Sequence, residues 1–351
     1  MKSLLKSKLP SGCIELIYLG LLLLPVRALA FPEMIGAGYQ SCRACHMDPS
    51  GSGPTTEYGK GIADEISTWS YAKEGEAFYG YLSLKPLGIH GDVRHLYYND
   101  KNNGQYASRS FFMQKEASVS LDASKNFSAL ISCGYYAEKP EAECRRYFAQ
   151  LRTSVLGFRA GRFLPAFGIN IPDHTKAVRA LFSQGKETLN AEVSVLSKYG
   201  EVFATRAFGR ESGVYIGANP SVNVRDEGDG YVLKTNLFLA RGLQAGVSYA
   251  LLSNGLETVG TPSYHATFAT ESFAAFGEYQ LYVDEEIKAY ASLGVKPFRG
   301  LWLKVELDEA VKPPTIKNDI YGTIDWLPRP HFQVTFSASK DRSILVSHFY
   351  L

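Results

Sequence analysis

The sequence predicts an all-β fold: a closed transmembrane barrel of about 16 antiparallel strands, with a small N-terminal segment before it. Three observations support this prediction, namely the composition, a period-two alternation of residue types, and the spacing of the turns. The chain of 351 residues holds 22 Tyr, 20 Phe and 32 Gly, and these types favour strands and turns. A hydrophobic fraction of 45% with 21% charged residues excludes an intrinsically disordered chain.

Apolar and more polar residues alternate along short runs that begin near Ile89. In one run Phe332, Val334 and Phe336 alternate with Gln333 and Thr335. A period of two indicates a strand with one apolar and one polar face. Sixteen runs are predicted as strands: 89–98, 109–121, 127–137, 144–153, 155–164, 190–197, 200–208, 230–240, 243–252, 263–271, 274–283, 286–296, 301–309, 318–326, 331–339 and 343–351.

The connections between these runs alternate between short and long. Residues 122–126 and 198–199 form tight turns, whereas 99–108 and 168–189 form long connections. Barrels of the bacterial outer membrane have short periplasmic turns, longer external loops and an even number of strands. A soluble β-sandwich is the alternative, but it does not require this regular alternation. The turns therefore favour an outer-membrane barrel with both ends at the periplasmic face.

Residues 1–30 are predicted to be a secretory signal peptide. Lys2, Lys6 and Lys8 precede an apolar stretch, and Ala28 to Ala30 offer a cleavage site. An uncleaved N-terminal anchor is the alternative. Removing this segment takes away four basic residues and one acidic residue, which changes the net charge from +2 to −1. Nucleic acid is therefore not an expected partner.

The chemistry-bearing motif is C-x-x-C-H, formed by Cys42, Cys45 and His46. This is the attachment sequence of c-type haem, because two thiols on one turn reach the two vinyl groups of a porphyrin. His46 then becomes the proximal ligand of the iron. A disulfide between the two cysteines and half of a zinc site are the alternatives, and no second Cys/His pair at a metal-like spacing follows. We therefore predict one covalently bound haem c.

The other residues around the haem are less well defined by the sequence. The carbonyl of Pro49 is a candidate to orient the His46 ring. For the distal ligand, Met34 must fold back over the ring, whereas His90 lies on the lumen-facing side of the first strand. His174 and an open pentacoordinate iron are further alternatives, and for His90 the sequence favours a lumen-lining role without a metal.

The haem motif also defines the domain organisation. Residues 31–75 form the predicted haem segment, 76–88 a linker and 89–351 the barrel. A segment of about forty residues cannot bury a haem alone. We therefore expect this segment to close the periplasmic mouth of the barrel or its lumen.

Two further features lie on the barrel. The connection after residue 161 would present four side chains at a constriction if it folds into the pore, and otherwise forms a solvated loop; these pore-lining candidates are Arg162, Asp173, His174 and Lys176.

Cys133 and Cys144 could form a disulfide, which an oxidising compartment permits. Strand parity argues against this bond, because Cys133 shares a face with Ile131 and Cys144 with Arg146. An irregular hairpin between the two strands would still allow the disulfide.

The signal peptide, the single C-x-x-C-H motif and the predicted barrel together resemble the fused monohaem cytochrome–porins of the bacterial outer membrane, best known as iron(II) oxidases. The stretch 161–168 is also similar to a segment of phosphate-selective-type porins. The first resemblance implies transfer of single electrons between an external donor or acceptor and a periplasmic cytochrome, with outer-membrane lipid around the barrel. Iron(II) oxidation belongs to that resemblance, although no iron-binding residue can be matched. The alternatives are a diffusion porin with a haem-bearing plug and a soluble periplasmic haem β-protein.

Overall fold

The computed structural model describes most of the chain from Pro32 onward. The described residues are 32–49, 53–69, 83–84, 86–102, 105–136, 141–169, 176–179, 181–182, 187–209, 214–216, 229–253, 258–282, 286–312 and 315–350. The predicted signal peptide, with Cys13, lies outside them, as does most of the linker. None of the described helices is long and apolar enough to cross a membrane.

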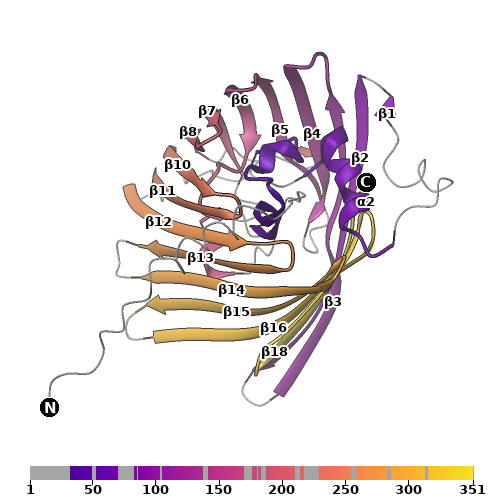
Figure 1. Ribbon diagram of the computed structural model, residues 1–351, viewed down its shortest axis with the longest axis vertical. Helices are drawn as coiled ribbons and strands as arrows, with labels where there is room; N and C mark the ends of the chain where they lie inside the picture. Colours follow the sequence, from indigo (N-terminus) through magenta and orange to yellow (C-terminus); the bar gives the residue numbers. More distant parts are fainter. Residues whose placement is uncertain are drawn as a thin grey trace, which may run out of the picture.

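Sixteen strands form a closed antiparallel barrel in the described part of the chain (Figure 1). Each strand pairs with the next, and β18 pairs with β2 to close the ring. The barrel strands are β2 (Leu87–Asn102), β3 (Gln105–Leu121), β4 (Phe127–Tyr136), β5 (Ala142–Arg152), β6 (Leu156–Phe163), β7 (Thr188–Ser197), β8 (Gly200–Phe208), β10 (Asp229–Ala240), β11 (Leu243–Ser253), β12 (Thr258–Ala269), β13 (Phe273–Leu281), β14 (Ile287–Phe298), β15 (Leu301–Lys312), β16 (Thr315–Arg329), β17 (Phe332–Ala338) and β18 (Arg342–Tyr350). Two short strands, β1 (Ser83–Leu84) and β9 (Val214–Ile216), pair with β2 and β5. The predicted fold class and strand number are confirmed.

The two faces of the barrel wall differ in the way that a membrane requires. On β4, Ile131 is 47% exposed on the outside while its neighbour Ser132 is fully buried inside. The same alternation places Leu293 outside and Ser292 inside on β14. Apolar side chains on the exterior with polar ones toward the lumen are the pattern of an outer-membrane barrel, because the exterior contacts lipid. A closed ring with this pattern is incompatible with the soluble sandwich.

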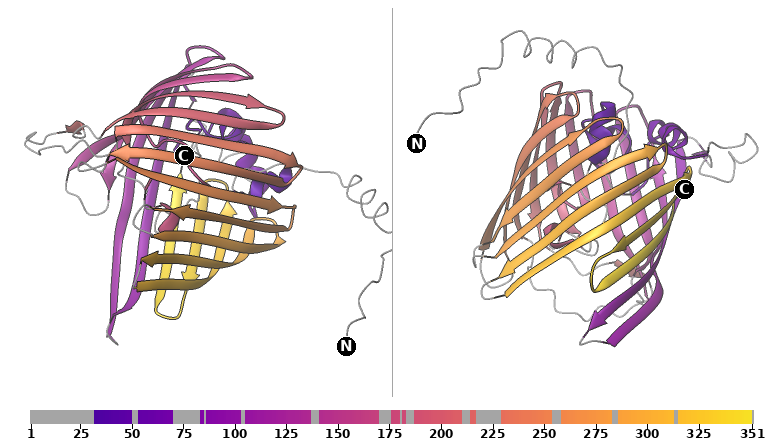
Figure 2. Two further views of the ribbon diagram at one scale, coloured as in Figure 1. Left: turned by 90° about the vertical axis from the view of Figure 1, so that its left-hand side faces the viewer. Right: turned by 60° about the horizontal axis from the view of Figure 1, so that its bottom comes forward.

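The N-terminal segment lies inside the ring of strands, near one end (Figures 1 and 2). It comprises two 3-10 helices, η1 (Pro32–Ala37) and η2 (Cys42–Ala44), and one α-helix, α2 (Glu57–Ile66). Helix α2 begins after Thr56, whose hydroxyl accepts a hydrogen bond from the Gly59 amide at 3.1 Å, as expected of an N-cap. The segment leaves the lumen where the Thr68 amide donates to the Leu327 carbonyl at 2.9 Å.

The connection between β6 and β7 also enters the lumen. Leu164, Phe167 and Phe182 are buried together against the barrel wall, and Ile169 packs with Phe276. The turn at Gly168 has a φ of +56° and brings the backbone against the carboxylate of Glu278, so glycine is favoured there. The 3-10 helix η4 (Ala177–Arg179) follows. The described parts of this connection therefore fold into the barrel rather than into solvent.

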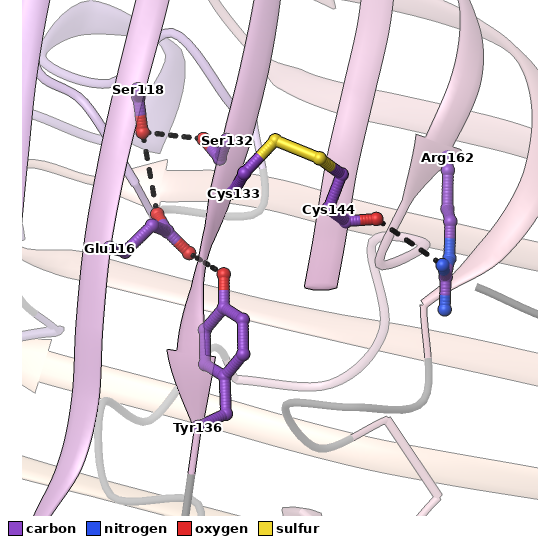
Figure 3. Close-up of a disulfide and its surroundings, with 7 residues drawn as sticks. All are labelled: Glu116, Ser118, Ser132, Cys133, Tyr136, Cys144 and Arg162. Carbon is purple, nitrogen blue, oxygen red and sulfur yellow. Dashed lines mark hydrogen bonds between the residues drawn. A yellow bond between two sulfur atoms is a disulfide. The ribbon is translucent and has the colours of Figure 1, made fainter. Parts of the chain in front are cut away.

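Cys133 and Cys144 form a disulfide between β4 and β5 (Figure 3). The parity argument against this bond was wrong, because the register between the two strands shifts between Ser132 and Cys133. A bulge adds one residue on one strand and so changes which side chains lie opposite each other. Residues 143–146 are consecutively buried, so the simple alternation fails on β5 as well.

Candidate functional site

The C-x-x-C-H motif occupies a single tight turn. The Ser41 hydroxyl accepts a hydrogen bond from the Arg43 amide at the start of η2. The His46 amide then donates to the Cys42 carbonyl at 3.0 Å. Cys42 and Cys45 are both free cysteines, so they do not form the disulfide that was one alternative for this pair. The turn brings the two thiols and the imidazole of the motif together.

Helix α2 packs directly on this turn. The Thr56 amide donates to the Cys45 carbonyl at 2.8 Å, and the Thr56 hydroxyl donates to the Ala44 carbonyl at 3.1 Å. Gly59 lies so close to the Cys45 carbonyl that a Cβ atom there would collide with it. The motif and α2 are therefore a single packed unit.

Burial sets the protonation states of the motif. It raises the pKa of Cys42 and of Cys45 to about 11, because a thiolate is poorly solvated there. Burial also lowers the pKa of His46. At neutral pH the site therefore holds two thiols and a neutral imidazole, and the neutral imidazole is the form that binds metals.

The motif opens onto a cavity of about 210 Å³ between the N-terminal segment and the barrel wall. The segment contributes mostly apolar side chains to it, including Met34, Ile35, Ile62, Ala63 and Ile66. The wall contributes charged and polar side chains, including Asp92, Arg94, Glu201, Lys234, Asn236, His265, Gln333 and His348. Gly168 and Ile169 of the inward-folded connection also line the cavity.

These residues fit a c-type haem. Both thiols are free, His46 lines the same cavity, and its buried Nδ1 atom has no hydrogen-bond partner within the described part of the chain. The apolar lining suits the porphyrin ring, and the cations Arg94 and Lys234 suit its carboxylates. Within the described residues, no three or more His, Cys, Asp or Glu side chains gather in a group that could hold a metal ion.

Polar contacts fix the motif to one side of the barrel. Asp48 is fully buried and forms an ion pair with Arg159 of β6 at 2.6 Å, and Arg159 also pairs with Glu192 of β7 at 3.0 Å. The side-chain amide of Gln150 donates to the Met47 carbonyl at 3.0 Å. The loop that follows His46 is therefore held against β5 and β6.

A second set of contacts reaches the neighbouring and the opposite walls. The Ser41 hydroxyl donates to the Glu201 carboxylate at 2.7 Å. Glu33 of η1 pairs with Lys304 of β15 at 2.7 Å, and Lys304 pairs with Asp325 of β16 at 3.1 Å. The N-terminal segment is thus attached around the lumen rather than at one point.

The remaining predicted residues lie in varied surroundings. Pro49 is buried and lines the cavity with His46. His90 is buried in the wall, where its Nε2 atom lies 2.9 Å from the Ser120 hydroxyl, and it is not among the described residues that line the cavity. Asp173 and His174 lie outside the described residues.

The two described pore-lining candidates are held far apart in the fold. Arg162 pairs with Glu143 of β5 at 3.2 Å. It also donates to the Cys144 carbonyl at 3.3 Å, as Figure 3 shows. Lys176 pairs with Glu306 of β15 at 3.2 Å. Both cations are buried in ion pairs, so these two residues do not form a single ring of open charge.

Two histidines at the cavity were missed in the sequence. The Nε2 atom of His265, on β12, lies 2.6 Å from the Asn236 amide oxygen. The Nε2 atom of His348, on β18, lies 3.1 Å from an oxygen of Asp92. Each lies on the polar, inward face of its strand, so the period-two pattern could have placed both in the lumen. Their position along the barrel axis, level with the motif, is not visible in that pattern.

Neither a protein-family model nor a curated protein matches this chain, but solved porin structures do. OmpF of Salmonella typhi, in complex with daunomycin, matches with a TM-score of 0.54 at 10% identity, over 76% of this chain and 97% of that chain. A substituted porin of Rhodopseudomonas blastica gives 0.58 at 7% identity, over 76% and 100%. A loop-deletion mutant of OmpT from Vibrio cholerae gives 0.52 at 9% identity, over 76% and 99%. At these identities the likeness shows the fold, which is that of the porin barrels of the bacterial outer membrane.

Proposed function

We propose that the protein is an outer-membrane cytochrome–porin, which moves single electrons between an external donor or acceptor and the periplasm through one c-type haem. The observation that carries the proposal is that Cys42, Cys45 and His46 open together onto one cavity inside a barrel of porin fold. The bound haem would supply a one-electron couple. Iron(II) is a suitable external donor to test, because the sequence resembles iron-oxidising cytochrome–porins.

The chain's own residues have three tasks in this proposal. Cys42 and Cys45 attach the group covalently, and His46 binds the iron as a neutral imidazole. Ile62 and Ala63 of α2 keep water from one face of the cavity. Burial of this kind, together with axial ligation, sets the potential of a haem.

The proposal implies a redox partner and places the haem motif at one side of the membrane. The motif lies near one end of the barrel (Figure 2), which we assign to the periplasmic side because both ends of the barrel sequence lie there in an even-stranded barrel. One haem near one end does not reach across the whole membrane, so a soluble periplasmic cytochrome is expected to exchange electrons with it.

Haem attachment is the first test. Outer-membrane fractions containing the wild type, separated on a denaturing gel, should show a band that stains for haem. The variant Cys42→Ser with Cys45→Ser should lose the stain, because the thioether bonds cannot form. The matched control is Cys133→Ser with Cys144→Ser, which removes the other cysteine pair and should keep it. A wild type without stain contradicts the proposal.

A diffusion porin with a haem-bearing plug is the second candidate, favoured by the likeness of the barrel to porins. Conductance of the purified protein in a planar bilayer separates the two. A conduit should show little ion current and should be reduced by external iron(II) in vesicles. An open ohmic pore whose haem is not reduced from outside favours the porin and contradicts the conduit.

A further inference from the structure

We infer that Met34 is the distal axial ligand of the haem, so that the iron is held between His46 and a thioether from η1. This inference rests on the proposed function and adds the ligand that the motif itself does not supply. Met34 is 7% exposed and lines the same cavity as His46.

The first argument is the position of the two anchors of the N-terminal segment. Glu33, next to Met34, is paired with Lys304 on β15. Asp48, two residues after His46, is paired with Arg159 on β6. In the closed ring of sixteen strands, β6 and β15 are eight strands apart in either direction. The segment therefore approaches the cavity from diametrically opposite walls, with Met34 at one side and His46 at the other.

The second argument is the path of the chain between them. After η1 the backbone turns back at Gly38, whose φ is +97°, and the Tyr39 amide donates to the Met34 carbonyl at 3.3 Å. Gly36 is pressed against the Thr270 carbonyl so closely that a side chain there would collide. Only seven residues lie between Met34 and Cys42, and this reversal gives the fold-back that the sequence alone left open.

The third argument compares Met34 with the two histidines at the cavity. The Nε2 atoms of His265 and His348 face Asn236 and Asp92, so ligation through Nε2 would break a hydrogen bond within the wall. The thioether of Met34 forms no comparable bond within the described part of the chain. A thioether is a soft, neutral ligand that occurs opposite histidine in c-type haems and raises their reduction potential.

The test is spectroscopic and uses the purified full-length protein. The oxidised wild type should show the weak far-red charge-transfer absorption of an iron(III)–thioether bond, and Met34→Leu should lose it and become high-spin. Because Met34 is also a buried apolar residue, Met34→His is the second variant: it should stay low-spin with a lower midpoint potential. Met47→Leu is the matched control and should keep the absorption, since Met47 is equally buried but does not line the cavity.

The outcomes separate the inference from the proposed function. If Met34→Leu retains both the absorption and the midpoint potential of the wild type, the inference is wrong. The same holds if His265→Ala or His348→Ala alone converts the haem to high-spin while Met34→Leu does not. A wild type that lacks covalent haem altogether contradicts the proposed function instead, because no iron is then present to be ligated.

Discussion

Two opposite walls of the barrel hold the N-terminal segment in the same way but with different cations. On β6, Arg159 lies between Asp48 of the segment and Glu192 of the wall. On β15, Lys304 lies between Glu33 of the segment and Asp325 of the wall. In both places the wall cation already has a wall carboxylate, and the segment adds a second one.

The two anchors differ in how strictly they orient the segment. The guanidinium of Arg159 bonds two carboxylates and also stacks over the Phe163 ring, 3.5 Å from its centre. The ammonium of Lys304 is a compact charge without a fixed fork of donors. The comparison teaches that the His46 side of the site is held by a forked, stacked cation, whereas the Met34 side is held by a compact charge together with the packing of Ile35 against Ala269 and Ala274.

Removing the cation of the β6 anchor should have the largest effect. Arg159→Met removes the guanidinium that pairs with the buried carboxylates of Asp48 and Glu192, and breaking a buried pair costs about 3–5 kcal/mol. Asp48→Asn should cost less, since Arg159 keeps Glu192. Urea unfolding of the refolded barrel measures both. If Asp48→Asn lowered the free energy of unfolding as much as Arg159→Met or more, the remaining pair of Arg159 with Glu192 would not be stable without Asp48.

The disulfide strengthens the barrel between β4 and β5, on the same side as the Arg159 anchor of β6. It joins β4 and β5 across a sequence separation of 11 residues, and a loop of this length corresponds to about 3 kcal/mol of lost chain entropy in the unfolded state. Cys133→Ser with Cys144→Ser should therefore lower the unfolding midpoint, and a reducing agent should lower that of the wild type equally. If the reducing agent left the unfolding midpoint of the wild type unchanged, the two thiols would not be bridged.

Much of the fold was predictable because its determinants are local. Alternation within single runs, such as Phe332 to Ala338, gave the strands to within a few residues, and the spacing of Cys42, Cys45 and His46 gave the motif. The anchors were not predictable. Asp48 and Arg159 are 111 residues apart, and alternation shows only that Arg159 points inward, not which residue it meets.

Two further results show where local patterns fail. The disulfide was misjudged because the pairing of β4 with β5 skips Arg145 between the Ser132–Arg146 and Cys133–Cys144 pairs. This shift in register changes the parity and is not visible in the residue types of the two strands. The histidines at the cavity depend on how far each strand is shifted along the barrel axis. That shift follows from pairing around the whole ring, which no single run of residues reveals.

The smallest predicted effect tests whether α2 fixes the His46 side of the site as firmly as the anchors do. Glycine to alanine inside a helix normally stabilises it, by about 1 kcal/mol. Gly61→Ala should do so, because no atom lies near its added Cβ, whereas Gly59→Ala should destabilise, because its Cβ would meet the Cys45 carbonyl. Thermal unfolding and the yield of haem-stained protein should change in opposite directions for the two variants. Equal stabilisation by both would mean that α2 can move away from the motif without cost, and the motif would then be positioned by its contacts with the barrel wall rather than by α2.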